Sequence, residues 1–142
     1  MRFRKSSHSI YRTEYHLVWI PRYRRKIFTK GVKEYAQGVL SHLDSLEPDI
    51  EVIKVNVQLD HVHMVAVIPP RFAVAKVVSF IKNQSAKILK AKFPFLKKVY
   101  IEQEGMWSTG YCVSTIGLNE KEILRYVEYQ GKEDSGQLQI TF

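Results

Sequence analysis

The chain has 142 residues and a formal charge of +8 at pH 7, and 45% of its residues are hydrophobic. This length suits one domain with one hydrophobic core, so we treat residues 1–142 as a single domain. A single cysteine excludes an intrachain disulfide framework and favours a reducing, cytoplasmic location. The apolar runs are too short to span a membrane, so we expect no membrane partner. The positive charge favours nucleic acid as a partner, although many small proteins are merely basic.

The first third of the chain predicts a strand followed by a helix. Residues 1–9 are polar and basic, and we expect a flexible arm there. Residues 14–20 are rich in aromatic and β-branched side chains, which predicts a strand. Apolar residues then recur at helical spacing from 32 to 46, with Thr29 as a candidate N-cap and Pro48 as a stop.

The middle third predicts a β-hairpin and a second helix. Residues 50–58 alternate between apolar and polar side chains, and residues 61–68 form a nearly continuous apolar run. Only Leu59 and Asp60 separate the two runs, so they should pair as a hairpin. An apolar stripe at helical spacing predicts a helix over 73–92, with a row of lysines on its solvated side.

The last third predicts two strands and a third helix. Residues 97–102 read as a short strand and residues 107–116 as the last main strand. Asn119, with Glu122 three residues later, resembles a capping box that opens the helix, and Gly131 is placed to end it.

The tail, residues 132–142, is polar, and we expect it to be loose, although residues 138–142 could add an edge strand. The order of elements predicts an α+β fold: a ferredoxin-like split βαβ sandwich, with an antiparallel sheet covered by two helices and a C-terminal helix added. The other sheet face would be open to a ligand or a second subunit.

Two histidines at the start of the strand 61–68 are the first candidate site residues. His61 and His63 share one face of the strand, because residues i and i+2 point the same way. The opposite face is wholly apolar, so the histidines should face away from the helix-covered core. Two imidazoles can bind one divalent cation, and Asp60 could hold the second nitrogen of one of them. Spacing alone leaves a metal site and ordinary structural histidines both open.

The C-terminal helix supplies the second pair of candidates. Tyr126 and Gln130 are four residues apart and therefore share a helix face. With eight tyrosines in the chain, ordinary packing is the alternative for Tyr126. The amide at i+4 distinguishes Tyr126 from Tyr129, which has Arg125 and Glu133 in the equivalent positions.

Four ordered segments together resemble the single-tyrosine HUH transposases of IS200-like insertion sequences, the TnpA type. The resemblance covers about residues 10–131, and its segments are Tyr15 to Arg25, Asp60 to Met64 with Pro69 and Pro70 after it, Trp107 to Tyr111, and Tyr126 to Gln130.

The resemblance implies a site and a substrate. It implies that His61, His63 and Gln130 bind a divalent ion, Mg²⁺ or Mn²⁺, and that Tyr126 is the nucleophile. It further implies a homodimer, in which the tyrosine helix of one subunit can complete the site of the other, acting on single-stranded DNA hairpins. The second tyrosine, Tyr129, leaves open which hydroxyl attacks.

A basic cluster follows the first strand and is the candidate DNA-binding surface. Its cations would contact phosphates and its tyrosine would stack on a base; the residues are Arg22, Tyr23, Arg24, Arg25 and Lys26. Three alternatives remain beside a transposase: a non-catalytic ferredoxin-like nucleic-acid-binding module, a metallohydrolase that uses water, and a domesticated transposase-like hairpin endonuclease.

Overall fold

The computed structural model describes residues 3–101 and 104–136. Its main sheet is antiparallel and has the strand order β4-β5-β3-β6. The four strands are β3 (Glu14–Trp19), β4 (Glu51–Gln58), β5 (His61–Val67) and β6 (Cys112–Ser114). With one helix after β3 and another after β5, this order is the expected ferredoxin-like split βαβ arrangement.

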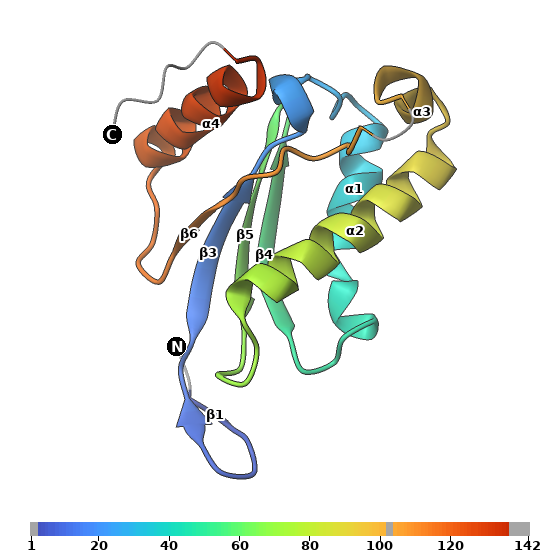
Figure 1. Ribbon diagram of the computed structural model, residues 1–142. Helices are drawn as coiled ribbons and strands as arrows, with labels where there is room; N and C mark the ends of the chain where they lie inside the picture. The colour runs from blue at the N-terminus through green and yellow to red at the C-terminus, as the bar shows by residue number, and fades with distance from the viewer. Residues whose placement is uncertain (1–2, 102–103, 137–142) are drawn as a thin grey trace.

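Helices α1 (Val32–Ser41) and α2 (Val74–Lys92) cover one face of this sheet (Figure 1). The alternating positions of the strands supply the sheet side of this core; among them, Leu17, Trp19 and Met64 are almost completely buried. The predicted apolar stripe of α2 faces inward, with Val77, Ile81 and Leu89 buried. The large core therefore lies on the face opposite the two histidines, as predicted.

The hairpin between β4 and β5 has the predicted two-residue turn, although a bulge between Val52 and Lys54 interrupts the predicted alternation of β4. Gln58 pairs with His61, so that only Leu59 and Asp60 form the turn. This turn places Asp60 immediately before the histidine strand, at one end of the sheet.

Helix α4 (Glu120–Asp134) lies on the other face of the sheet (Figure 1). Its Ile123 and Val127 pack against Val18 and Ile20 of the β3 region in a second, small apolar cluster. The face that we expected to be open is thus partly covered by the C-terminal helix. The capping box of Asn119 opens this helix as predicted.

Helix α1 is shorter than its apolar pattern suggested. It begins after Gly31, whose φ of 91° favours glycine, rather than at a Thr29 cap, and it ends at Ser41. The side chains of Ser41 and His42 bond to the carbonyl groups of the last turn, which stabilises the early end. A short 3₁₀ turn, Leu43–Ser45, continues toward Pro48.

The strand predicted over 97–102 is wrong, since residues 97–99 belong to helix α3 (Phe95–Val99) and Tyr100 is its C-cap. Leu96 and Tyr100 are both buried, and their spacing of four residues buries two side chains on one side of a helical turn. The strand predicted over 107–116 is reduced to β6 and a single bridge between Pro21 and Trp107.

Both chain ends differ from the expectation. In the predicted arm, β1 (Arg4–Lys5) pairs with β2 (Ile10–Tyr11), and Arg4 forms an ion pair with Glu51 of β4. At the other end, residues 132–134 belong to α4 rather than to a loose tail. The possible edge strand at 138–142 lies outside the described residues.

Gly131 does not end α4. It is buried inside the helix, and a Cβ atom there would lie 3.0 Å from Cβ of Arg24. The glycine is therefore needed for close packing rather than for a helix stop. Gly136, with φ of 69°, is the glycine that follows the helix.

No helix in the part of the chain described here is long and apolar enough to cross a membrane.

Candidate active site

Asp60, the residue before His61, fixes the orientation of the His61 imidazole. The Nδ1 atom of this buried imidazole lies 2.9 Å from Oδ1 of Asp60. Burial raises the pKa of Asp60, but hydrogen bonds from His61 and Arg24 outweigh burial, and the net pKa is lowered. An ionised carboxylate only accepts hydrogen bonds, so Nδ1 of His61 carries the proton and the Nε2 lone pair is left for a ligand.

Arg24 connects this acid to helix α4. Its Nε donates to Oδ2 of Asp60 at 2.9 Å, and its aliphatic part packs against Gly131. Arg24 thus supports the Asp60–His61 pair with its guanidinium group and contacts the end of the helix that carries Tyr126 with its aliphatic part.

His63 lies beside a histidine that the motif did not include. Its Nε2 is 3.4 Å from Nδ1 of His16, which lies on the neighbouring strand β3. Burial, followed by the charge of His16, lowers the pKa of His63. The imidazole is therefore neutral at neutral pH, which is the form that binds a metal ion.

Tyr126 and Gln130 face each other on α4, as their spacing predicted. The Tyr126 hydroxyl donates a long hydrogen bond of 3.4 Å to Oε1 of the buried Gln130. Burial is the main cause that raises the pKa of the Tyr126 phenol, so the resting group is protonated. Tyr129 is exposed on the same helix and lacks an amide one turn away.

Three residues that sequence reasoning missed surround Gln130. Asp134 accepts a hydrogen bond from Nε2 of Gln130 at 3.1 Å and one from Oγ of Ser108 at 2.7 Å. Gly110 lies so close that an added Cβ would be 2.8 Å from Cδ of Gln130. The spacing from Gln130 to Asp134 was visible in the sequence, but the predicted helix end at Gly131 concealed it.

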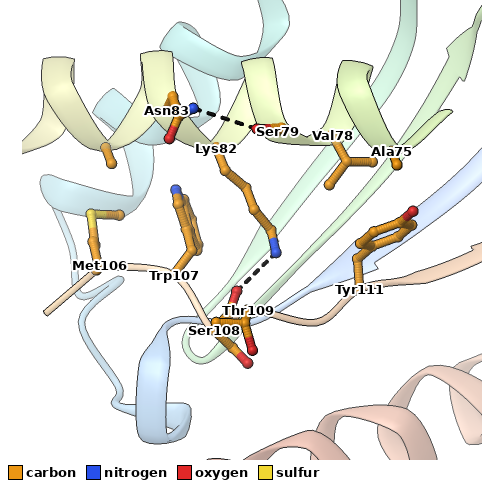
Figure 2. Close-up of a pocket in the computed structure, with 12 residues that line it drawn as sticks. Ala75, Val78, Ser79, Lys82, Asn83, Met106, Trp107, Ser108, Thr109 and Tyr111 are labelled. Carbon is orange, nitrogen blue, oxygen red and sulfur yellow. Dashed lines mark hydrogen bonds between the residues drawn. The ribbon is translucent and has the colours of Figure 1, made fainter. Parts of the chain in front are cut away.

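Lys82 of α2 holds the loop that carries Ser108 and Gly110. Its Nζ donates to the backbone carbonyls of these two residues at 2.8 and 2.7 Å, and Figure 2 shows the lysine reaching from α2 toward Ser108. Burial is the main cause that lowers the pKa of Lys82 to about 8. The lysine lines a cavity of about 370 Å³ between α2 and the segment 105–111.

The basic cluster is only partly available to a ligand. The guanidinium groups of Arg22 and Arg25 donate to the backbone carbonyls of Gly105 and Val99, and Arg24 is paired with Asp60. Lys26 and Tyr23 are exposed. Tyr23 also has a φ of 63°, and its backbone N–H donates to Asp134 at 2.9 Å. Much of this segment therefore has a structural role.

The predicted site residues form two groups in one chain. Asp60 contacts His61, and Tyr126 contacts Gln130, but within residues 3–101 and 104–136 no hydrogen bond joins either histidine to the tyrosine or the amide. Val18 lies between the groups: it is the cross-strand partner of His63 and belongs to the apolar cluster against which Tyr126 packs. Among the same residues, no three His, Cys, Asp or Glu side chains form a metal-binding group, and the predicted set holds only two.

A comparison with known families decides the family to which the chain belongs. Residues 9–130 match the family model described as transposase, IS200 like. This chain belongs to the IS200-like transposase family. The matched range contains both histidines, the tyrosine and the amide.

Individual transposases are similar in sequence to this chain over nearly its whole length. The transposase for insertion sequence element IS200 of Salmonella typhimurium is 32% identical over 128 residues, which cover 90% of this chain and 83% of that protein. The ISDra2 transposase TnpA of Deinococcus radiodurans is 28% identical, covering 92% of each chain. A crystal structure of a candidate transposase from Deinococcus radiodurans R1 superposes with a TM-score of 0.77 at 26% identity, covering 89% of this chain and 97% of that one.

Proposed function

We propose that this IS200-like transposase cleaves and rejoins single-stranded DNA at hairpin-bearing element ends, with Tyr126 as the nucleophile. The observation that carries the proposal is the pairing of Tyr126 with Gln130 on the helix that covers the histidine face of the sheet. A phenol beside an amide oxygen, on the helix that covers the sheet face of the two imidazoles, has the groups needed to attack a phosphate held by an ion.

The donor atoms suit a divalent ion. His61 can offer Nε2 because Asp60 accepts from its Nδ1. Gln130 can offer its oxygen because its amide nitrogen donates to Asp134 and the oxygen accepts only a long bond from Tyr126. His63 is neutral, since burial lowers its pKa. We therefore propose His61, His63 and Gln130 as ligands of Mg²⁺ or Mn²⁺. Such an ion would offset the negative charge that develops on the phosphate oxygens.

The reaction that we propose conserves the phosphodiester bond energy. A bond forms between the Tyr126 oxygen and phosphorus, and the bond from phosphorus to the 3′-oxygen breaks. The phenol proton passes to water, and the departing 3′-oxygen takes up a proton. The 5′-phosphotyrosine that results can be attacked by another 3′-hydroxyl, so rejoining needs no ATP.

DNA would approach over a positively charged surface. The chain has a net charge of +8, and the exposed Tyr23 and Lys26 are its available contacts in the basic cluster. A phenol ring can stack on an unpaired base, and an ammonium can contact a phosphate. Arg22, Arg24 and Arg25 act mainly by holding this segment against the protein.

We propose that the protein works as a homodimer whose site can be shared. The two groups of site residues are not joined by a hydrogen bond within the described chain, which leaves room for α4 of a second copy to bring Tyr126 to the histidines. Mixing Tyr126→Phe protein with His61→Ala protein tests this directly. Restored cleavage in the mixture supports a shared site, and its absence supports a site within one chain.

The test of the activity is a covalent adduct. Protein, a hairpin-bearing single strand and Mn²⁺ should give a product of lower mobility on a denaturing gel, and chelation should prevent it. Tyr126→Phe should abolish the adduct, whereas the matched Tyr129→Phe should retain it. An adduct that persists in Tyr126→Phe, or DNA binding without any adduct, would remove the proposed chemistry.

A further inference from the structure

The two ends of the Gln130 carboxamide differ in chemistry, and only the oxygen can bind a metal ion. A glutamine side chain rotates easily, so an unsupported one would present its amide nitrogen as readily as its oxygen. Gln130 is buried and lies between two helix neighbours, Tyr126 one turn before it and Asp134 one turn after it. Its orientation must therefore be fixed by neighbouring groups.

Asp134 is the acceptor that decides which way Gln130 turns. Its carboxylate receives three hydrogen bonds: from Nε2 of Gln130 at 3.1 Å, from Oγ of Ser108 at 2.7 Å and from the backbone N–H of Tyr23 at 2.9 Å. A carboxylate cannot donate, so the amide nitrogen must face it. The oxygen of Gln130 is then turned away from Asp134, toward the Tyr126 hydroxyl at 3.4 Å and the backbone of Gly110.

Helix α2 and the loop that contains Ser108 and Gly110 also restrain the Gln130 carboxamide. Lys82 of α2 fixes the carbonyls of Ser108 and Gly110, so the loop that supplies the Ser108 hydroxyl is tied to a helix of the large core. Gly110 leaves no room for a side chain beside the carboxamide. Movement of Gln130 toward this loop is therefore blocked.

We propose that Asp134 is a positioning residue for the transposase site: it orients the Gln130 carboxamide so that its oxygen, and not its nitrogen, faces the metal ion and Tyr126. The proposal rests on the proposed metal-dependent function. Asp134 lies beyond residues 9–130, the range that matches the family model. It acts through Gln130 and need not contact DNA or the ion.

Mn²⁺ binding to the full chain, measured by titration calorimetry, tests this role. Asp134→Asn replaces an acceptor-only group with one that can also donate, and it should weaken Mn²⁺ binding by about tenfold or more. Glu128→Gln makes the same charge change on an exposed site of the same helix and should leave the affinity unchanged.

A double-mutant comparison separates positioning from general support. If Asp134 acts through Gln130, then Asp134→Asn combined with Gln130→Ala should bind Mn²⁺ as Gln130→Ala does alone. Additive losses, or wild-type affinity in a folded Asp134→Asn protein, would overturn the proposal. Wild-type protein that binds no Mn²⁺ would overturn the metal site itself, and the proposed role with it.

A measurement without metal distinguishes a change in Gln130 orientation from a failure of the variant to fold. The side-chain amide resonance of Gln130 should shift in Asp134→Asn and, by a smaller amount, in Ser108→Ala, which removes one donor to the carboxylate. Circular dichroism checks that each variant is folded. If the Gln130 resonance is unchanged in Ser108→Ala and in any folded Asp134 variant, Asp134 does not orient the carboxamide.

Discussion

The helices on the two faces of the sheet are attached by different kinds of contact. On one face, α1 and α2 bury a large apolar core that includes Leu17, Met64 and Leu89. On the other face, the buried apolar cluster under α4 is limited to Val18, Ile20, Ile123 and Val127. Much of the attachment of α4 is polar and lies at its C-terminal end, at Gln130 and Asp134. The large apolar core and the proposed site therefore lie on opposite faces of the sheet, and we expect α4 to be the more easily displaced element.

The largest expected effect tests the stability of the first face. Leu89→Ala removes a fully buried side chain of α2, and it should lower the free energy of unfolding by about 2–5 kcal/mol, because it leaves a cavity in a close-packed core. Ile123→Ala on α4 should lower it by only about 1–2 kcal/mol, because α4 can detach without global unfolding. Chemical denaturation measures both values.

Hydrogen exchange gives a more local test of the same contrast between the two sheet faces. Ile123→Ala should speed exchange of the α4 amides far more than exchange of the β5 amides. Equal acceleration in both elements would mean that α4 is part of the main cooperative unit, and the contrast between the faces would not hold.

The next expected effect concerns the loop that closes over Gln130. Gly110→Ala places a methyl group against the Gln130 carboxamide and should displace it, with a loss of Mn²⁺ affinity of about tenfold. Gly38→Ala is the matched control, because an added Cβ at Gly38 meets no atom within 4 Å. An unchanged affinity in Gly110→Ala would show that the close approach has no role in the site.

A smaller effect should follow from the acid that supports His61. The pKa of Asp60 is lowered in the folded chain, so its contribution to stability is present above about pH 4 and is lost as the pH falls through the lowered value. Asp60→Asn should reduce the free energy of unfolding at neutral pH by about 1 kcal/mol. The difference from wild type should shrink in acid, and a difference that is constant with pH would contradict the assigned charge.

The smallest effect is spectroscopic and needs no metal or DNA. Burial raises the pKa of Tyr126, so this phenol should not ionise between about pH 9 and pH 11. Ultraviolet titration of wild type and Tyr126→Phe should therefore show the same phenolate absorbance over that range. A lower absorbance in the variant would mean that Tyr126 ionises readily in the free protein.

Much of the scaffold could be predicted from the sequence because its signals are local. The alternation in β4, the two-residue turn before His61 and the apolar stripe of α2 each arise from a pattern within one element. Where local signals were ambiguous, burial decided the outcome. Residues 97–102 had the composition of a strand, but the need to bury both Leu96 and Tyr100 favours a helical turn.

The contacts within the site were likewise predictable where the two residues are close in sequence. The pairs His61 with Asp60 and Tyr126 with Gln130 are close in sequence, and their spacing indicated that they would touch. The contacts of Lys82 with Ser108, and of Tyr23 with Asp134, join residues far apart in the chain and had no local signal. Gly131 was interpreted as a helix end because a glycine that makes room for Arg24 looks the same in sequence as one that ends a helix.

The most direct test of the central claim is a crystal of the protein soaked with Mn²⁺ and measured for anomalous scattering. We expect one strong peak about 2.0–2.3 Å from an imidazole nitrogen of His61, an imidazole nitrogen of His63 and the carboxamide oxygen of Gln130 from the same or a second copy. A peak elsewhere, or a site that includes the histidines and leaves Gln130 and Tyr126 remote in every copy, would contradict it.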